Sequence, residues 1–177
     1  MADAKITGLA EDTAPTSDDL VTTVHDPAGT PANRKVTLAN LAKGLGGAWA
    51  TWDITWTNLT ETSGTETAVY TQIGKTVRCR FTFTFGASSA ISGSVSLSLP
   101  VTAATYDAGV PVGLVQCVDA SGGNFFGPIF ITSTTVANVK LFRTDSTYAS
   151  QSNLSSTVPM TWTTSDKLVG QFMYEAA

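Results

Sequence analysis

One short run constrains the fold of this chain more than any other feature. Within residues 75–85, polar and apolar side chains alternate strictly from Thr76 to Phe85. Successive side chains of a β-strand point to opposite faces, so this pattern predicts a strand with one face in a hydrophobic core and the other toward solvent or a neighbour. The apolar face is expected to consist of Val77, Cys79, Phe81, Phe83 and Phe85.

Further strands are expected before and after this run. Residues 94–99 repeat the alternation and end at Pro100, while residues 68–73 lead through Gly74 into the long strand as a tight hairpin. Residues 52–57, 114–119, 128–134, 139–143, 158–163 and 168–174 are also strand-like. About nine short strands without a long helix predict an all-β fold, an antiparallel β-sandwich or jelly-roll-like domain.

The polar face of the long strand carries Arg78 and Arg80. One interpretation is that they keep an exposed sheet face soluble. The other is that they form salt bridges across a subunit interface, where arginine is enriched. The sequence favours neither interpretation.

The composition changes near Gly44, Gly46 and Gly47, where a charged first part gives way to a chain rich in Thr and Ser. We therefore expect an N-terminal segment at residues 1–46 and the β-sandwich domain at 47–177. The first part predicts a strand at 19–26, a turn at 27–33, a returning strand at 34–38 and a short helix at 39–44. A hairpin plus a short helix buries little apolar surface, so it should be stable only when packed on copies of itself or on a larger partner.

The composition narrows the possible partners. Charged residues make up 14% of the 177 residues, against about 25% in typical soluble proteins. A net charge of −4 with scattered bases argues against nucleic-acid binding. With no apolar run of membrane-spanning length and no secretory signal, we expect a soluble protein made in the cytoplasm. Cys79 and Cys117 are expected to be buried thiols rather than a disulfide.

No catalytic constellation is found in the sequence. The one histidine, His25, lies beside Asp26 and Pro27 and far from any plausible nucleophile. Nucleophile-elbow, phosphate-loop, dinucleotide and calcium-loop motifs are absent, and the carboxylates lie mostly in predicted turns rather than in pairs suited to glycan hydrolysis. We therefore predict a non-enzymatic protein with no catalytic, cofactor-binding or metal-binding residue.

Three tryptophans, Trp49, Trp52 and Trp56, lie close together at the start of the β-domain. Exposed tryptophans can stack on sugar rings. However, Trp52 and Trp56 share a parity with Ile54, which fits core or interface packing better than a sugar platform.

The N-terminal part resembles a known group. Residues 5–9 (KITGL), 13–16 (TAPT), 18–24 (DDLVTTV) and 34–41 (RKVTLANL) are similar to the N-terminal segment of many tailed-phage fibre and head-decoration proteins. In that group the segment precedes a variable distal domain and fixes the protein to the virion. The resemblance implies that the virion-anchoring residues are Asp19, Leu20, Val21, Val24, Val36, Leu38 and Leu41.

The second part resembles the β-domains at the tips of such fibres and decorations, in residues 70–77, 93–100 and a C-terminal set. Those jelly-roll-like domains are usually trimeric, so the resemblance implies a homotrimer on the virion surface and possible contact with a host receptor. The C-terminal set is Trp162, Asp166, Leu168, Gly170, Phe172 and Tyr174.

Longer members of the group place a fibrous shaft between anchor and tip, and this chain has none. That departure favours a squat structure near the particle surface. We therefore expect a capsid decoration or short head fibre attached through other virion proteins. The alternative is a short tail fibre or adhesin that binds host surface polysaccharide, with candidate loops at residues 87–92 and 119–125.

Overall fold

The computed structural model describes residues 16, 18–25, 28–29, 32–38, 41, 48–105, 109–143 and 150–177. The chain divides into two compact units, Met1–Gly47 and Ala48–Ala177. Each unit is considered by itself.

The first unit contains a two-stranded antiparallel hairpin of β1 (Leu20–His25) and β2 (Ala32–Thr37). The register places Val21 opposite Val36, and the backbone N–H of Leu38 donates to the carbonyl of Asp19 (2.9 Å). The two strands predicted for this part are thus present. The helical turns predicted at residues 39–44 lie outside the described residues, except for Leu41.

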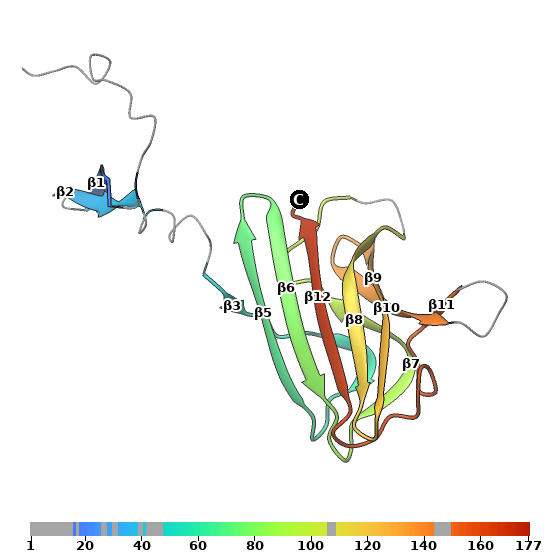
Figure 1. The fold of residues 1–177 in the computed structure, drawn as a ribbon. Coiled ribbons are helices and arrows are strands. Elements are labelled where there is room, and N and C mark those ends of the chain that lie inside the picture. The colour runs from blue at the N-terminus through green and yellow to red at the C-terminus, as the bar shows by residue number, and fades with distance from the viewer. Residues whose placement is uncertain are drawn as a thin grey trace, which may run out of the picture. The chain divides into compact units, whose positions relative to one another are not determined.

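The second unit is built from one antiparallel sheet (Figure 1). Its ten strands follow the order β3-β5-β6-β12-β8-β9-β10-β7-β4, with β11 paired to β10 outside this path. The strands are β3 (Ala50–Thr51), β4 (Trp56–Thr60), β5 (Thr65–Ile73), β6 (Thr76–Thr84), β7 (Ala90–Ser98), β8 (Pro111–Asp119), β9 (Gly123–Ser133), β10 (Val136–Arg143), β11 (Ser150–Asn153) and β12 (Lys167–Glu175).

The sheet curls over on itself to enclose the core. Its two end strands, β3 and β4, are consecutive in the chain and are joined only by residues 52–55. In Figure 1, β5, β6, β12 and β8 lie side by side as one layer, and the sheet continues from β8 through β9 and β10 to β7 and β4, which form the other layer. The fold is therefore all-β and sandwich-like, as the sequence predicts.

The core lies between these layers and is rich in aromatic side chains. Along β6, Val77, Cys79, Phe81 and Phe83 are buried, and the residues between them are not. The alternation that predicted this strand is therefore confirmed. Trp52 of the crossover and Trp56, the first residue of β4, pack edge-on against Phe81, with ring centroids 6.3 and 5.4 Å away. These two large side chains thus close the core, as their shared parity indicated.

Of the predicted strands, 52–57 is wrong in extent and 158–163 is absent. Residues 52–55 are not a strand but the crossover between β3 and β4, and residues 158–163 form a packed loop. In this loop the ring of Trp162 stacks on Phe85 at 4.6 Å and its Nε1 donates to the carbonyl of Ser155 (2.9 Å). Apolar residues at 52–55 and 158–163 pack against the core, but their backbone forms no strand pairing. The short strand β11, Ser150–Asn153, was missed because all of its residues are polar or small.

Asp166 holds two loops of this unit together. Its side chain is fully buried. One carboxylate oxygen accepts a hydrogen bond from the Ala120 N–H (2.9 Å), and the other accepts from the N–H and hydroxyl of Thr163. The carboxylate therefore ties the β8–β9 turn to the loop before β12. A turn role for aspartates was predicted, and Asp166 and Asp119 both have it.

Replacing Asp166 by alanine should lower the free energy of unfolding by about 3 kcal/mol, because the amides of Ala120 and Thr163 would lose charged acceptors in a buried site. Urea unfolding followed by tryptophan fluorescence measures this loss. Asp119→Ala is the matched control, because the Asp119 carboxylate accepts from Ser121 in a solvent-accessible turn, and it should cost much less than Asp166→Ala. Equal losses for the two variants would contradict a bracing role for Asp166.

Candidate functional site

The side of the β5–β6–β12–β8 layer that faces away from the core carries the features that distinguish this molecule. We call this side, with Phe126 of the adjoining β9, the outer face. One row across it runs in register from Val69 through Arg80 and Gln171 to Leu114. Each of these residues lies between inward-pointing core residues of its own strand.

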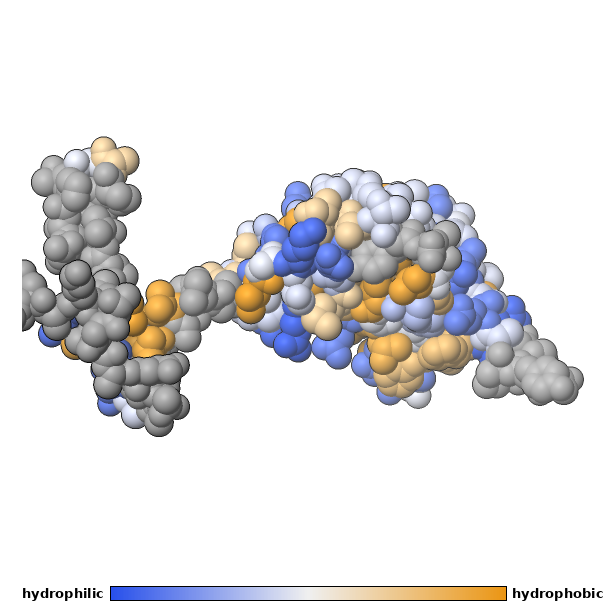
Figure 2. Space-filling view, turned by 90° about the horizontal axis from the view of Figure 1, so that it is seen from above, coloured by the Kyte–Doolittle hydropathy of each residue, from blue (hydrophilic) through white to orange (hydrophobic). Residues whose placement is uncertain are grey.

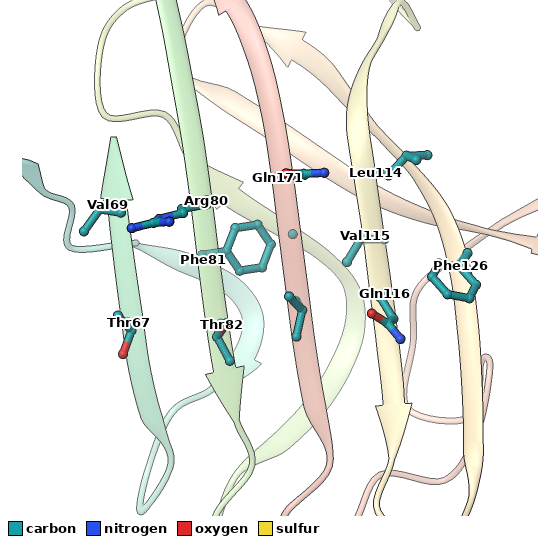
Figure 3. A pocket seen from close by; sticks show the side chains of 12 residues that line it. Thr67, Val69, Arg80, Phe81, Thr82, Leu114, Val115, Gln116, Phe126 and Gln171 are labelled. Carbon is teal, nitrogen blue, oxygen red and sulfur yellow. The ribbon is translucent and has the colours of Figure 1, made fainter. Parts of the chain in front are cut away.

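A groove of about 540 Å³ lies on the outer face. Figure 3 shows side chains of β5 and β6 on one side of β12 and side chains of β8 and β9 on the other. Gln116, on the second side, donates through Nε2 to the Asn124 side chain (2.9 Å). An adjoining hollow of about 440 Å³ extends toward Arg78 and Met173. Grooves of this size are large enough for a small ligand or for the side chains of a partner protein.

Large apolar side chains protrude from the outer face. Leu114, Phe126 and Met173 are 54%, 52% and 57% exposed. Figure 2 shows orange and tan side chains protruding from one side of this unit. The exposed positions of β7, by contrast, are the small residues Ala90, Ser92 and Ser94. Contiguous exposed apolar surface is typical of interaction sites.

The charges of the outer face are mostly positive. Arg78, Arg80 and Lys167 all lie on it, and the Arg80 guanidinium lies over the ring of Trp49, 4.5 Å from its centroid. No ion pair within the described part of the chain engages these three cations. The carboxylate that shares the face, Glu175, lies 3.9 Å from the ammonium of Lys75. The face therefore combines apolar side chains with uncompensated positive charge.

A group of carboxylates lies elsewhere on the same unit, beside the crossover. The negative charge of Asp53 acts on Glu61, and the charges of both act on Glu66; we call these three residues the acidic edge. Burial, and then the charge of Asp53, raise the pKa of Glu61. Burial also raises the pKa of Glu66, against the opposing effect of hydrogen bonds from Trp56 Nε1 and the Ile54 N–H (3.2 Å). None of the three is ion-paired within the described residues.

Replacing Glu61 by glutamine should stabilise the second unit at pH 7. Because the folded-state pKa of Glu61 is raised above its usual value of 4.5, its ionised form costs stability above the folded-state pKa and nothing below the unfolded-state pKa. The gain should be at most about 0.5 kcal/mol, since Glu61 is largely exposed, and it should vanish near pH 4. Asp119→Asn is the control of opposite sign, because hydrogen bonds from Ser121 lower the pKa of Asp119. Thermal unfolding at both pH values, at a concentration where the protein is monomeric, measures the effect, and a gain for Glu61→Gln that persists at pH 4 would contradict it.

The two cysteines take no part in this surface. Both are buried free thiols, as predicted, and burial raises the pKa of each to about 12. Cys79 pairs with Phe172 of β12 and Cys117 with Leu168, so the thiols lie at different levels of the core. The un-ionised form is a poor nucleophile, which makes both thiols inert.

The predicted functional positions fall in different places. Leu20 and Val21 of the hairpin are 57% and 37% exposed, while Asp19, Val36, Leu38 and Leu41 are partly buried. Val24 lies in β1 opposite Asn33. The hairpin thus holds several proposed anchoring residues together, and their role stays a prediction.

The candidate binding loops are shorter than expected. Residues 90–92 of the first belong to β7, and residues 123–125 of the second belong to β9. Sequence reasoning missed Leu114, Phe126 and Met173 as surface residues. The sequence did contain one indication of an apolar outer face. Val169 and Met173 are apolar, yet they occupy outward positions of β12, between the inward positions Leu168, Gly170, Phe172 and Tyr174.

Comparison with known protein families, curated proteins and solved structures finds no match for this chain. Among the described residues, no three His, Cys, Asp or Glu side chains lie close enough to hold a metal ion. Likewise, the described part contains no helix long and apolar enough to cross a membrane. The function must therefore be inferred from the outer face, the hairpin and the sequence motif.

Proposed function

We propose that this chain is a non-enzymatic structural protein of a tailed-phage particle, a capsid decoration or short head fibre displayed on the virion surface. The N-terminal unit attaches to other virion proteins, and the β-unit is the displayed part. The protein works as a homo-oligomer, with the trimer favoured by its resemblance to trimeric fibre tips.

The observation that carries the proposal is the exposure of Leu20 and Val21 in the hairpin formed by the anchor-like motif. An isolated two-stranded hairpin is marginally stable in water, and apolar side chains on its surface are stabilised by burial against a partner. A hairpin of this kind suits attachment to a larger surface, which is the role that the motif has in the phage proteins it resembles.

Electron microscopy of particles that carry a labelled copy of the protein tests the assignment. We expect label on the capsid, and we expect Leu20→Ser with Val21→Ser to abolish incorporation while the β-unit stays folded. Thr57→Ser, on the exposed side of β4, is the control and should incorporate normally. Particles that lack the protein and have bare tails but unchanged capsids would refute the capsid assignment.

A second candidate is a short tail fibre or adhesin that binds host surface polysaccharide. The groove favours it, because Trp49 is 43% exposed and stacks on Arg80 beside apolar walls. Purified protein should then bind host cells and compete with phage adsorption, and Trp49→Ala should weaken both effects. Absence of binding and competition would exclude this candidate.

A further inference from the structure

The residue types of the outer face are those that are enriched in the interfaces between subunits. Interface cores are enriched in aromatic residues, Met and Arg and depleted of Lys, Glu, Asp and Ser. Here Trp49 lies against Arg80, Phe126 lines the same groove as Arg80, and Met173 lines the adjoining hollow with Arg78. This composition favours the second of the two interpretations open to the arginines, that they lie in a contact between subunits.

The charge of the outer face decides how two copies can meet. In a twofold contact the same patch of both copies meets itself, so the positive patch of Arg78, Arg80 and Lys167 would meet the positive patch of the other copy. Like charges brought together across an interface cost several kcal/mol. A face-to-face contact is therefore disfavoured, and the face needs a surface of opposite charge.

The acidic edge of the same chain supplies that surface. Asp53 and Glu61 are exposed, Glu66 is half-buried, and all three lack a described cation. Their mutual repulsion remains uncompensated in the single chain. An arginine from a neighbouring copy would relieve it, and arginine pairs with carboxylates through a planar, two-pronged geometry.

We infer that the outer face of one copy packs against the acidic edge of the next copy, in a head-to-tail contact that repeats around a closed ring. Leu114, Phe126 and Met173 supply the buried apolar area, and Arg78 and Arg80 pair with Asp53 and Glu61. This inference rests on the proposed function as an assembly of copies and names the two surfaces that would join them. A contact between two different surfaces generates rings when its rotation closes, which is the symmetry that a trimer requires.

Charge reversal in the full-length protein tests the contact. One variant reverses the face (Arg78→Glu, Arg80→Glu), a second reverses the edge (Asp53→Lys, Glu61→Lys), and a third carries all four changes. Glu66 is left intact because it accepts the hydrogen bonds of Ile54 and Trp56. Lys140→Glu, on β10, is a control for reversing a cation outside the outer face. Sedimentation equilibrium measures association, and circular dichroism verifies folding.

We expect each single-surface variant to lower the association constant by at least about 100-fold, and the four-change variant to recover to within about tenfold of the wild type. Lys140→Glu should associate normally, and salt should weaken wild-type association. A monomeric wild type, unaltered association of the face-reversed variant, or no recovery in the four-change variant would overturn the inference.

A further outcome would assign the groove to a sugar. If the wild type is monomeric and its tryptophan fluorescence, unlike that of Trp49→Ala, responds to oligoglucuronate but not to a neutral oligosaccharide, the positive face binds an acidic glycan and the copy-to-copy contact is excluded. Particle labelling is independent of these measurements. Failure of the contact and failure of the virion assignment are therefore distinguishable.

Discussion

Replacing Gly127 by alanine is expected to destabilise the second unit by about 3 kcal/mol or more and to abolish its folding at elevated temperature. A β-carbon at this position of β9 would lie 2.0 Å from the carbonyl oxygen of Lys140 and 2.4 Å from the Cα of Leu141. Favourable contacts between carbon atoms begin near about 3.5 Å. Both obstructing atoms belong to the backbone of β10, so no side-chain rotation relieves the overlap.

Urea unfolding of Gly127→Ala, followed by circular dichroism, measures this effect. Gly93→Ala in β7 is the matched control, because its β-carbon would meet only the side chain of Asn58, at 3.2 Å. That variant should lose less than about 1 kcal/mol. If the two glycine variants were equally stable, the close approach of β9 and β10 would not constrain this part of the sheet.

The close backbone approach at Gly127 also shows what the sequence could not reveal about the fold. Alternation along β6 and β7 predicted strands with the correct inward faces, since parity depends only on local backbone geometry. The curl of the sheet depends instead on non-local contacts such as that between Gly127 and β10. Nothing in the residues around Gly127 distinguishes such a position from a turn or a bulge.

The crossover between β3 and β4 was misinterpreted for a related reason. Trp52, Ile54 and Trp56 alternate as a strand would, and all three are buried. Their backbone nevertheless leaves the ladder at Trp52, whose N–H donates to Ala68 (3.0 Å), and rejoins it at β4 on the opposite edge of the sheet. Burial of every second residue therefore indicates an extended chain that packs on a core. It does not show that the chain is paired in a sheet, because the sequence does not identify the neighbouring strand.

The outer face was predicted only through Arg78 and Arg80. Leu114 begins the strand predicted at 114–119 and Phe126 precedes the one predicted at 128–134, and neither run alternates in a way that marks an outward face. The face can be recognised only once the strand registers are known, because they place Arg80, Gln171 and Leu114 in one row across three strands. Uncompensated charge at Asp53, Glu61 and Glu66 likewise depends on residues that the crossover brings together.

Truncation of two phenylalanines of the second unit should have very different effects on the free energy of unfolding. Phe83 is fully buried, with ring centroids 5.0 Å from Phe85 and 6.1 Å from Trp56, so Phe83→Ala should cost about 4 kcal/mol through lost burial and the cavity it leaves. Phe83→Leu should cost about 1.5 kcal/mol, because most of the volume is kept. Urea unfolding at a concentration where the protein is monomeric measures both losses.

Phe126→Ala is the matched control for Phe83→Ala, because Phe126 is 52% exposed on the outer face. Its truncation should change the unfolding free energy by less than about 0.5 kcal/mol. It should weaken self-association, since Phe126 then contributes apolar area only when a second copy covers it. A large loss of monomer stability in Phe126→Ala would place this side chain in the core and remove the apolar part of the proposed contact. Loss of association without loss of stability would separate the residues that fold the chain from those that assemble it.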